Sequence, residues 1–492
     1  MNHVLNSDRP DKVALVEGGN AFTYAQVESR IVQFASGLLA GRSDLEEARV
    51  AFLIPAGVDY VTALHGAWRA GGIAIPLNVA SAESEWEHCL TSAGVTQVIA
   101  NEQTLGSIEG LCNRLAIPVA TVSDTRTDRV SPLPELAPTR RAMIVFTSGT
   151  TSKPKGAVTT HGNIAAQIET LITAWEWQAD DVIPLFLPLH HVHGIINVLS
   201  CALCAGATVH AMPKLDLATL CAQVAADTYS VFMAVPTIYV KLIDYFENHE
   251  DQDVEGICEG FANMRLNVSG SAACPVEVFG EWQQLTGQVL LERYGMTEIG
   301  MALSNPYRGE RRPGYVGRPL PDVTVQLVDE EGGIVTEEGV PGEIWIQSPT
   351  VFLEYWGNVE ATEASFSDGW FCTGDIAVIE DGYYRIMGRS SVDIIKSGGY
   401  KLSALEIENT LLAHPQIAEV AVVGIADRTW GEAVAAVVAL KGDGDMTLET
   451  LKAWCNGQLS SYKVPKQLRV VDALPRNAMG KVVKPSLKPM FE

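Results

Sequence analysis

Positive charge is scarce in this sequence. Its 492 residues include 35 Lys and Arg against 59 Asp and Glu, which gives a formal net charge of −24. The basic residues do not form a cluster, whereas binding along a nucleic-acid backbone requires a basic face. The composition therefore argues against a nucleic-acid partner, and an anionic ligand has to be met by local positive sites.

A secretory signal and an uninterrupted membrane span are also missing. Residues 1–19 lack the apolar core of a signal peptide, so we expect a cytoplasmic protein. The longest uncharged stretch, residues 194–212, has the length of a membrane span. Asn197, His210 and an Ala-Gly-Ala break at 205–207 interrupt it. We predict a buried helix that turns into a strand there, and no membrane span.

Cysteine spacing indicates no metal site. The nine cysteines are scattered, and Cys201 and Cys204 form a lone CxxC pair with no second pair and no histidine at zinc-finger spacing. Packing in the core explains these two residues better than zinc does. Reduced thiols are the expectation for a cytosolic protein.

Strand and helix patterns alternate through the first part of the chain. Apolar runs at 50–54, 72–75 and 96–100 alternate with helical patterns such as 60–70, which is typical of parallel α/β layers. Between residues 323 and 347, closely spaced strands with acidic turns predict antiparallel β-structure. Because the chain is longer than one hydrophobic core usually supports, we expect more than one domain.

A third pattern follows Gly388. The predicted elements are helices at 405–414 and 448–459 and strands at 420–423 and 435–440. Together they describe a compact α+β unit of about a hundred residues, which is a normal domain size. We therefore predict an N-terminal domain of residues 1–388 and a C-terminal domain of residues 389–492.

The segment 147–156, TSGTTSKPKG, has the composition of a loop that wraps a polyphosphate, and we call it the phosphate loop. Gly149 and Gly156 permit backbone conformations closed to other residues, hydroxyls add hydrogen-bond donors, and Lys155 adds charge. It is not a P-loop, because Lys153-Pro154 stands where that motif has Gly-Lys. A hydroxyl-rich surface loop is the alternative. The predicted ATP-binding residues here are Thr147, Ser148, Gly149, Thr150, Thr151 and Lys155.

Four further motifs follow in order. They are Tyr294-Gly295-Met296-Thr297-Glu298, Gly369-Trp370-Phe371-Cys372-Thr373-Gly374-Asp375, Gly388-Arg389 and Pro475-Arg476-Asn477-Ala478-Met479-Gly480-Lys481. With the phosphate loop, and over nearly the whole chain, they resemble the adenylate-forming superfamily of acyl-CoA synthetases, adenylation domains and firefly-type luciferases. The resemblance implies an α/β fold. A large N-terminal domain of layered α/β subdomains plus a β subdomain would precede a small, mobile α+β C-terminal domain.

The resemblance also implies roles for the Tyr-Gly-Met-Thr-Glu motif. Making an acyl adenylate brings a carboxylate to the α-phosphorus of ATP, so two anions must be neutralised and held in line. Glu298 would hold Mg²⁺ as a hard oxygen ligand, Thr297 would contact the α-phosphate, and Tyr294 would lie against the adenine. The alternative for Glu298 is a solvated acid at a turn.

Three charged residues complete the implied nucleotide site. Asp375 would accept hydrogen bonds from both ribose hydroxyls, and Arg389 would support the same sugar. Either residue alone could be half of a surface ion pair. Lys481 matches the lysine that reaches the ATP phosphates and the attacking carboxylate, whereas a lone lysine at that place would be part of a solvated tail.

In the superfamily the C-terminal domain rotates between the two half-reactions, pivoting two residues after the arginine of the Gly-Arg motif. That hinge residue is Ser391 here, where the family more often has Asp or Lys. Gly399 matches the glycine whose missing side chain lets the pantetheine arm of coenzyme A approach.

A histidine-rich segment, residues 190–194, reads His-His-Val-His-Gly. Its second histidine, His191, matches the position that gates the acyl site in the superfamily. Three histidines so close together also suggest a metal site, but no carboxylate or cysteine pattern supports one. We predict a gating or pocket role.

Arg293 indicates the acid. It directly precedes Tyr294 at the end of the acyl pocket, where members of the superfamily that activate monocarboxylates generally carry an uncharged residue. A buried, unpaired arginine is costly, so a substrate carboxylate is its natural partner. The alternative is that Arg293 pairs with Glu292 or with another acid of the protein.

Further residues belong to the same predicted pocket. Lys241 lies one helical turn beyond a pocket segment of the superfamily and could face the same cavity. Ser271, in the Gly-Ser-Ala-Ala segment that begins at Gly270, and His193, in the histidine-rich segment, join this pocket. Ser271 and Ala272 are also predicted to contact the nucleotide. With Arg293, this set resembles malonyl-CoA synthetases within the superfamily.

We therefore predict an ATP-dependent malonate CoA ligase. It would use Mg²⁺ and coenzyme A, act on a small dicarboxylic acid through an acyl-AMP, and release pyrophosphate and then AMP. Methylmalonate is left open as a further substrate. The alternatives are a short- or medium-chain fatty acyl-CoA synthetase, an adenylation enzyme that loads a carrier protein, and a binding protein without catalysis.

Overall fold

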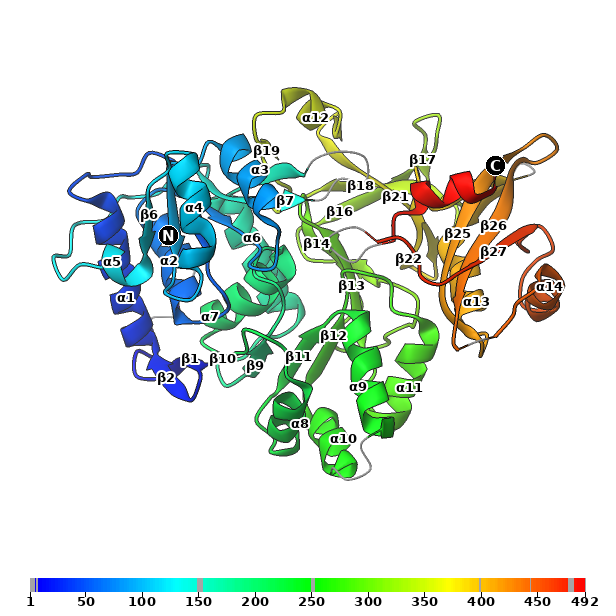
Figure 1. Cartoon of the computed structure of the whole chain (residues 1–492), viewed down its shortest axis with the longest axis horizontal. Coiled ribbons are helices and arrows are strands. Elements are labelled where there is room, and N and C mark those ends of the chain that lie inside the picture. The colour runs from blue at the N-terminus through cyan, green and yellow to red at the C-terminus, as the bar shows by residue number, and fades with distance from the viewer. Residues whose placement is uncertain are drawn as a thin grey trace.

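The computed structural model describes residues 5, 8–147, 154–248, 253–397, 400–442, 444–476 and 482–491. Along the chain, Figure 1 shows a layered α/β region in blue and cyan, a second α/β region in green, a β region, and a C-terminal unit in orange and red. The candidate functional residues lie where these regions meet.

The first region is built on a seven-stranded sheet with the strand order β19-β8-β7-β4-β3-β5-β6. Its strands are β3 (Arg49–Leu53), β4 (Ile73–Pro76), β5 (Gln97–Ala100), β6 (Val119–Thr121), β7 (Arg141–Thr147), β8 (Lys155–Thr160) and β19 (Glu354–Tyr355). Strand β3 is parallel to β4 and β5, as the alternating pattern predicted. The helices of this region are α1 (Tyr24–Leu39), α2 (Val58–Arg69), α3 (Glu83–Ala93), α4 (Leu105–Arg114), α5 (Val122–Thr125) and α6 (His161–Ala174).

Two smaller sheets follow, with the strand orders β2-β1-β10-β9 and β11-β12-β13-β14-β15. Their strands are β1 (Val13–Glu17), β2 (Asn20–Thr23), β9 (Val182–Leu185), β10 (Thr208–Ala211), β11 (Val231–Ala234), β12 (Leu266–Ser269), β13 (Leu291–Met296), β14 (Gly300–Ser304) and β15 (Arg318–Pro319). The helices of the second sheet are α8 (Leu217–Ala225), α9 (Pro236–Asn248), α10 (Val254–Asn263) and α11 (Val276–Thr286). Strands β11, β12 and β13 are parallel, so their carboxyl ends meet at one edge, the usual place for a ligand in an α/β sheet.

The uncharged stretch at 194–212 is buried. It forms most of the π-helix η1 (His193–Ser200), then α7 (Cys201–Ala205) and then β10. Gly206 ends α7 with a φ of 82°, which lets the chain leave the helix and enter the strand. The predicted helix that turns into a strand is confirmed. Among the described residues, no helix combines the length and the apolar character that crossing a membrane requires.

The region predicted to be antiparallel is an antiparallel sheet. Its strands are β16 (Thr324–Val328), β17 (Ile334–Val335), β18 (Gly342–Gln347), β20 (Phe366–Ser367), β21 (Trp370–Glu380) and β22 (Tyr383–Arg389), and the short helix α12 (Val359–Glu363) precedes β20. Strand β18 pairs with β16 on one side and with β21 on the other. This sheet carries the Gly369–Asp375 and Gly388-Arg389 motifs on neighbouring strands.

The C-terminal unit is a five-stranded sheet with helices. Its elements are β23 (Ile394–Ser397), β24 (Tyr400–Ser403), α13 (Ala404–Leu412), β25 (Ile417–Asp427), β26 (Gly431–Leu440), α14 (Leu448–Cys455), β27 (Gln467–Val471) and the 3₁₀ helix η2 (Lys484–Phe491). The helix predicted to reach residue 459 ends at Cys455 instead. Asn456 has an extended ψ of 125° and Gly457 a φ of 82°, and neither angle continues a helix.

The hydrophobic clusters divide near the predicted hinge. Two clusters of the C-terminal unit contain only residues between Ile395 and Phe491. The three large clusters of the preceding regions contain none after Ile386. A small cluster around Met387, with Ile394 packed against it, lies between them. We propose on this basis that residues 389–492 form a separate domain.

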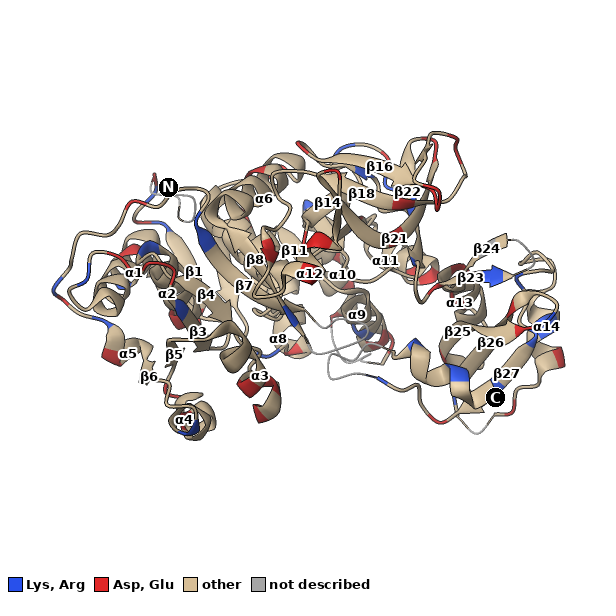
Figure 2. Cartoon of the chain, turned by 90° about the horizontal axis from the view of Figure 1, so that it is seen from above, with Lys and Arg blue, Asp and Glu red and all other residues tan. Residues whose placement is uncertain are grey.

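Acidic and basic residues are interspersed over the described chain, and Figure 2 shows no single face in that view on which the basic ones gather. Many basic side chains pair with acids, among them Arg140 with Asp44 and Arg265 with Asp181. An anionic substrate would therefore be bound by single basic residues and not by a basic surface.

Helix α6 begins with a capping box directly after β8. Oγ1 of Thr160 accepts a hydrogen bond from the Asn163 amide at 3.1 Å, and Oδ1 of Asn163 accepts one from the Thr160 amide at 2.9 Å. We expect Thr160→Ala to lower the free energy of unfolding by about 1 kcal/mol, measured by urea denaturation. Thr160→Ser keeps the hydroxyl and is the control. An equal loss in both variants would show that the cap is not the cause.

Candidate active site

The two strands beside the phosphate loop hold its ends. Thr147 ends β7 and Lys155 begins β8, and the Thr147 hydroxyl donates to the Lys155 carbonyl at 3.4 Å. The Lys155 ammonium lies 5.0 Å from the centroid of the Tyr355 ring. The predicted ATP-binding residues that lie outside the described part of the chain are Ser148, Gly149, Thr150 and Thr151. The described ends therefore place a hydroxyl and a cation at the base of the loop.

Glu298, the predicted metal ligand, is buried between β13 and β14 and is 5% exposed. Its Oε1 accepts a hydrogen bond from the Tyr355 hydroxyl at 2.8 Å. Burial raises the pKa of the Glu298 carboxyl, while the Tyr355 hydrogen bond opposes the shift. One tyrosine thus contacts both the predicted metal ligand and Lys155. A single carboxylate is a donor that Mg²⁺ uses when phosphate oxygens complete its shell, and the half-buried Thr297 precedes it.

The predicted ribose residues contact one another. Asp375 in β21 is paired in register with Arg389 in β22, and its Oδ1 lies 2.9 Å from the Arg389 Nε. The Tyr294 hydroxyl donates to Asp375 Oδ2 at 2.5 Å, and Arg389 Nη1 donates to the Thr373 carbonyl at 2.8 Å. Burial raises the pKa of the Asp375 carboxyl, and Arg389 is the main opposing influence. Asp375 and Arg389 therefore lie together, as the ribose prediction requires, and they also form an ion pair. Because Asp375 is buried, this is not the surface ion pair of the alternative.

At the carboxyl edge of the second sheet lies a cluster of three predicted pocket residues. His193 Nδ1 is 3.1 Å from Ser271 Oγ, and Arg293 Nη2 donates to the same oxygen over a long 3.5 Å. Burial, with Arg293 as the next influence, holds the pKa of His193 well below its ordinary value, so the imidazole is neutral at neutral pH. Ser271 therefore joins a neutral imidazole to a guanidinium.

The backbone at this cluster has two special positions. Ser271 has a φ of 70°, a left-handed conformation that is strained for a residue other than glycine. At Gly270, a Cβ would lie 2.6 Å from the Arg293 Cζ. Only glycine at that position lets the guanidinium lie against the chain, so the local sequence is fitted to Arg293.

The described residues around the Arg293 guanidinium satisfy it only in part. The residue is 3% exposed, its Nε has no hydrogen-bond partner, and no carboxylate among the described residues forms an ion pair with it. Glu292, the alternative partner, follows the alternation of a strand and points to the opposite face of β13. Burial lowers the pKa of Arg293 to about 10, and the negative charge of Glu292 opposes that shift from a distance.

The remaining predicted residues of this part of the site are Lys241, Ala272 and His191. Lys241 is exposed on α9, and no ion pair joins it to another described residue. Ala272 is exposed directly after Ser271. The His191 ring lies 4.1 Å from the His190 ring between centroids, and the two ring planes are tilted by 47°. Groups of at least three His, Cys, Asp or Glu side chains arranged to hold a metal ion are absent from the described residues.

The predicted hinge residue, Ser391, lies in an exposed turn between β22 and β23. Asp393, just beyond it, accepts a hydrogen bond from the Arg389 amide at 3.0 Å with Oδ2 and pairs with the Lys484 ammonium at 2.5 Å through Oδ1. Lys484 also pairs with Glu408 at 2.7 Å. A single carboxylate thus joins the ribose side of the site to the C-terminal unit.

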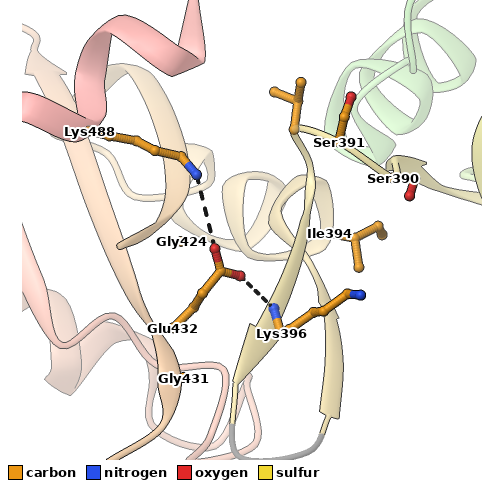
Figure 3. A pocket seen from close by; sticks show the side chains of 9 residues that line it. Ser390, Ser391, Ile394, Lys396, Gly424, Gly431, Glu432 and Lys488 are labelled. Carbon is orange, nitrogen blue, oxygen red and sulfur yellow. Dashed lines mark hydrogen bonds and ion pairs between the residues drawn. The ribbon is translucent and has the colours of Figure 1, made fainter. Parts of the chain in front are cut away.

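A cleft of about 340 Å³ opens beside Ser391, on the C-terminal unit. Figure 3 shows Glu432 between Lys488 and the backbone of Lys396 in this cleft. The Glu432 carboxylate accepts a hydrogen bond from the Lys396 amide at 2.7 Å and lies 4.0 Å from the Lys488 ammonium. The turn at Ser391 therefore borders open space. Two further predicted site residues, Gly399 and Lys481, lie outside the described residues.

Comparison with known proteins agrees with this geometry. Residues 5–356 match the family model described as AMP-binding enzyme, and residues 406–481 match the AMP-binding enzyme C-terminal domain. The chain belongs to the AMP-binding enzyme family. The resemblance read from the motifs and the adenylate-forming fold, with its large N-terminal and small C-terminal parts, are confirmed.

Three members of this family cover nearly the whole chain. The mitochondrial malonate–CoA ligase ACSF3 of Mus musculus is 42% identical over 97% of this chain and 88% of its own. A malonate–CoA ligase of Arabidopsis thaliana is 37% identical over 99% of this chain and 87% of its own. The crystal structure of ATP-bound MatB from Rhodopseudomonas palustris has a TM-score of 0.89 and 33% identity, covering 99% of this chain and 97% of that one.

Sequence reasoning missed three residues of the site in this family member. Gly270 was quoted only as part of a motif, although a glycine at a strand end signals a close approach. Tyr355 carries no motif, because it reaches Glu298 through the pairing of β19 with β8, which are distant in sequence. Asp393 lies two residues after the predicted hinge residue Ser391, and its two partners become visible only in the fold.

The contact between Gly270 and Arg293 gives a test. We expect Gly270→Ala to displace the guanidinium and to raise KM for the acid substrate about tenfold, with KM for ATP unchanged, because small misplacements in a site are costly. Steady-state kinetics measures both constants. Gly280→Ala is the matched control, since a Cβ there meets nothing within 4 Å. Unchanged KM for the acid in Gly270→Ala would contradict the role of this contact.

Glu292 gives a prediction about pH. Burial raises the pKa of its carboxyl from the ordinary 4.5 to about 7, against the opposing effects of the Cys274 and Gly314 amides and of Arg293. The folded protein therefore keeps a proton that the unfolded chain releases, and this stabilisation is lost as the pH rises through about 7. We expect the Tm of the wild type, measured relative to Glu292→Gln, to be lower at pH 8 than at pH 6. A constant difference would contradict the shifted pKa.

Proposed function

We propose that this protein is a malonate–CoA ligase that acts through malonyl-AMP. The observation that carries the proposal is the buried Arg293 guanidinium, which has no carboxylate in ion-pair contact among the described residues. A dicarboxylic acid has one carboxylate to react and a second to bind. The second is the natural partner for Arg293, with the Ser271 hydroxyl and the neutral His193 beside it.

The relatives support the choice of acid. The mouse and Arabidopsis proteins are named malonate–CoA ligases and extend over nearly the whole chain. The MatB structure was determined with ATP bound, which supports ATP as the nucleotide. Methylmalonate is proposed as a further substrate, because one methyl group changes binding in an apolar pocket by only about 1 to 3 kcal/mol.

The reaction has two balanced steps. In the first, a malonate oxygen attacks the α-phosphorus of ATP, the bond to the β-phosphate oxygen breaks, and pyrophosphate leaves. In the second, the thiol sulfur of coenzyme A attacks the acyl carbon and loses its proton, and AMP leaves with the bonding pair. Arg293 holds the distal carboxylate throughout, so the reacting carboxylate is presented to the nucleotide in a fixed direction.

The nucleotide residues have distinct parts in this proposal. Asp375 and Arg389 hold the ribose, with Tyr294 beside the adenine. Thr147 and Lys155, with the rest of the phosphate loop, hold the phosphates leaving as pyrophosphate. Glu298 provides a carboxylate oxygen for Mg²⁺, whose charge offsets that of the phosphates. Lys481 and Gly399 keep their proposed roles in adenylation and in admitting the pantetheine arm, with Ser391 as the hinge.

Two features stay predictions. Coenzyme A as the acceptor, rather than a carrier protein, follows the names of the relatives. The cytoplasmic location is also a prediction, and the mouse relative is described as mitochondrial.

Substrate comparison tests the proposal. We expect pyrophosphate release to be fast with malonate, slow with butyrate and slower with octanoate. Arg293→Met should lower kcat/KM for malonate about a hundredfold, because a charge-assisted contact is lost, while butyrate turnover changes little. Lys241→Met tests in the same assay whether the second predicted cation contributes.

Turnover of octanoate faster than that of malonate in the wild type would refute the proposal and favour a fatty acyl-CoA synthetase. Formation of AMP with a carrier protein but not with coenzyme A would show that coenzyme A is not the acceptor and that the enzyme loads a carrier protein. Equal losses for malonate and butyrate in Arg293→Met would remove Arg293 from acid selection.

A further inference from the structure

Glu292 is buried beside the candidate acyl pocket, and neither the motif resemblance nor the proposed function assigns it a part. It is 2% exposed and lies in β13 directly before Arg293, on the opposite face of the strand. An ionisable side chain in such a place needs a reason, because burying it is costly. Its contacts lead to the elements that build the pocket.

The side chain of Glu292 holds the loop that carries Ser271. Its Oε1 accepts a hydrogen bond from the Cys274 amide at 3.0 Å. Cys274 follows Ser271 in the short connection between β12 and α11, so this bond fixes the far end of the loop. The near end is fixed at Gly270 by its close approach to Arg293. The strained φ of Ser271 lies between these two fixed points.

The main chain of Glu292 is fixed as well. Its carbonyl accepts hydrogen bonds from the Asn305 amide at 3.0 Å and from Asn305 Nδ2 at 3.1 Å. Asn305 Nδ2 also donates to the Tyr315 carbonyl at 2.6 Å, and Asn305 Oδ1 accepts from the Arg312 amide at 3.1 Å. The strand that carries Arg293 is thus tied to the segment beyond β14, at the residue that also holds the Ser271 loop.

The charge of Glu292 has a second effect. The ionised form of Glu292 raises the pKa of the neighbouring Arg293, and because the pKa of Glu292 is itself about 7, this influence grows as the pH rises through 7. A carboxylate in direct contact would occupy the place that a substrate needs. One on the opposite face offsets part of the cost of burying Arg293 and leaves that place open.

We propose that Glu292 is a positioning residue for the dicarboxylate site, which sets the distance between Ser271 and Arg293 from behind the strand. This inference rests on the proposed function. It implies that KM for the acid depends on Glu292 more strongly than KM for ATP, because Glu292 holds the Ser271 loop, whereas of the proposed nucleotide residues only Tyr294 shares strand β13 with it.

Kinetics of two variants tests the proposal. We expect Glu292→Ala to raise KM for malonate about tenfold, with KM for ATP within about twofold of the wild type. Glu292→Gln keeps an oxygen for the Cys274 amide and lacks the charge, so its KM for malonate should lie between the two. Because it preserves the shape of the side chain, it also covers the case in which Glu292→Ala does not fold.

Cys274→Ala is the matched control. It alters a side chain that is 2% exposed, in the same loop, but leaves the amide that Glu292 binds. We expect its KM for malonate to equal that of the wild type. A rise as large as in Glu292→Gln would mean that any change of packing here has the same effect, and the positioning role would be lost.

Two results overturn the inference directly. One is an unchanged KM for malonate in both Glu292 variants, and the other is an equal rise in KM for malonate and for ATP. Failure of the proposed function looks different, since the wild type itself would then form no malonyl-CoA.

Discussion

The guanidinium of Arg293 is buried, no acid of the described chain forms an ion pair with it, and the acyl end of the molecule is arranged around that constraint. Taking such a charge out of water costs several kcal/mol, so the fold has to offset it without neutralising it. Gly270 leaves room for the guanidinium, Ser271 offers one oxygen in a strained conformation, and Glu292, with a pKa of about 7, adds negative charge from behind the strand as it ionises. The Arg293 Nε that has no hydrogen-bond partner in the described protein belongs to the group that, in the proposed function, binds the second carboxylate of the substrate.

The nucleotide end follows the opposite rule. Asp375, Arg389 and Tyr294 already contact one another, and Glu298 is bonded to Tyr355. In the proposed function these groups bind the same nucleotide in every turnover, so holding them in place beforehand reduces the ordering that binding requires. In this proposal, selectivity for the acid resides in Arg293, which has no ion-pair partner among the described residues. The nucleotide, which all substrates share, is bound by residues that already contact one another.

Much of this arrangement was predictable from the sequence. The periodicity of apolar residues gave the strands β3, β4 and β5, because each alternates with a helix that must cover the sheet. Glu298 and Asp375 were located because each belongs to a motif of consecutive residues that resembles one of the superfamily. Arg293 was located because it directly precedes such a motif.

Contacts between distant segments were not predictable from the sequence. Tyr355 reaches the site through a strand pair whose members are far apart in the chain, and no local pattern records such a pair. The early end of α14 was missed because Asn456 and Gly457 stop a helix that its apolar spacing would continue. Glu292 was considered only as a partner of Arg293, although alternation along a strand places neighbours on opposite faces.

Asp393 connects the turn at the proposed hinge to the body of the C-terminal unit. Its carboxylate is shared between the Arg389 amide, beside the ribose site, and the Lys484 ammonium in the C-terminal unit. In the proposed function, a rearrangement that separates these partners would also remove the hydrogen bond that holds the Arg389 amide. Thermodynamic linkage would then make the effect of the nucleotide on the rearrangement equal in free energy to the effect of the rearrangement on nucleotide binding.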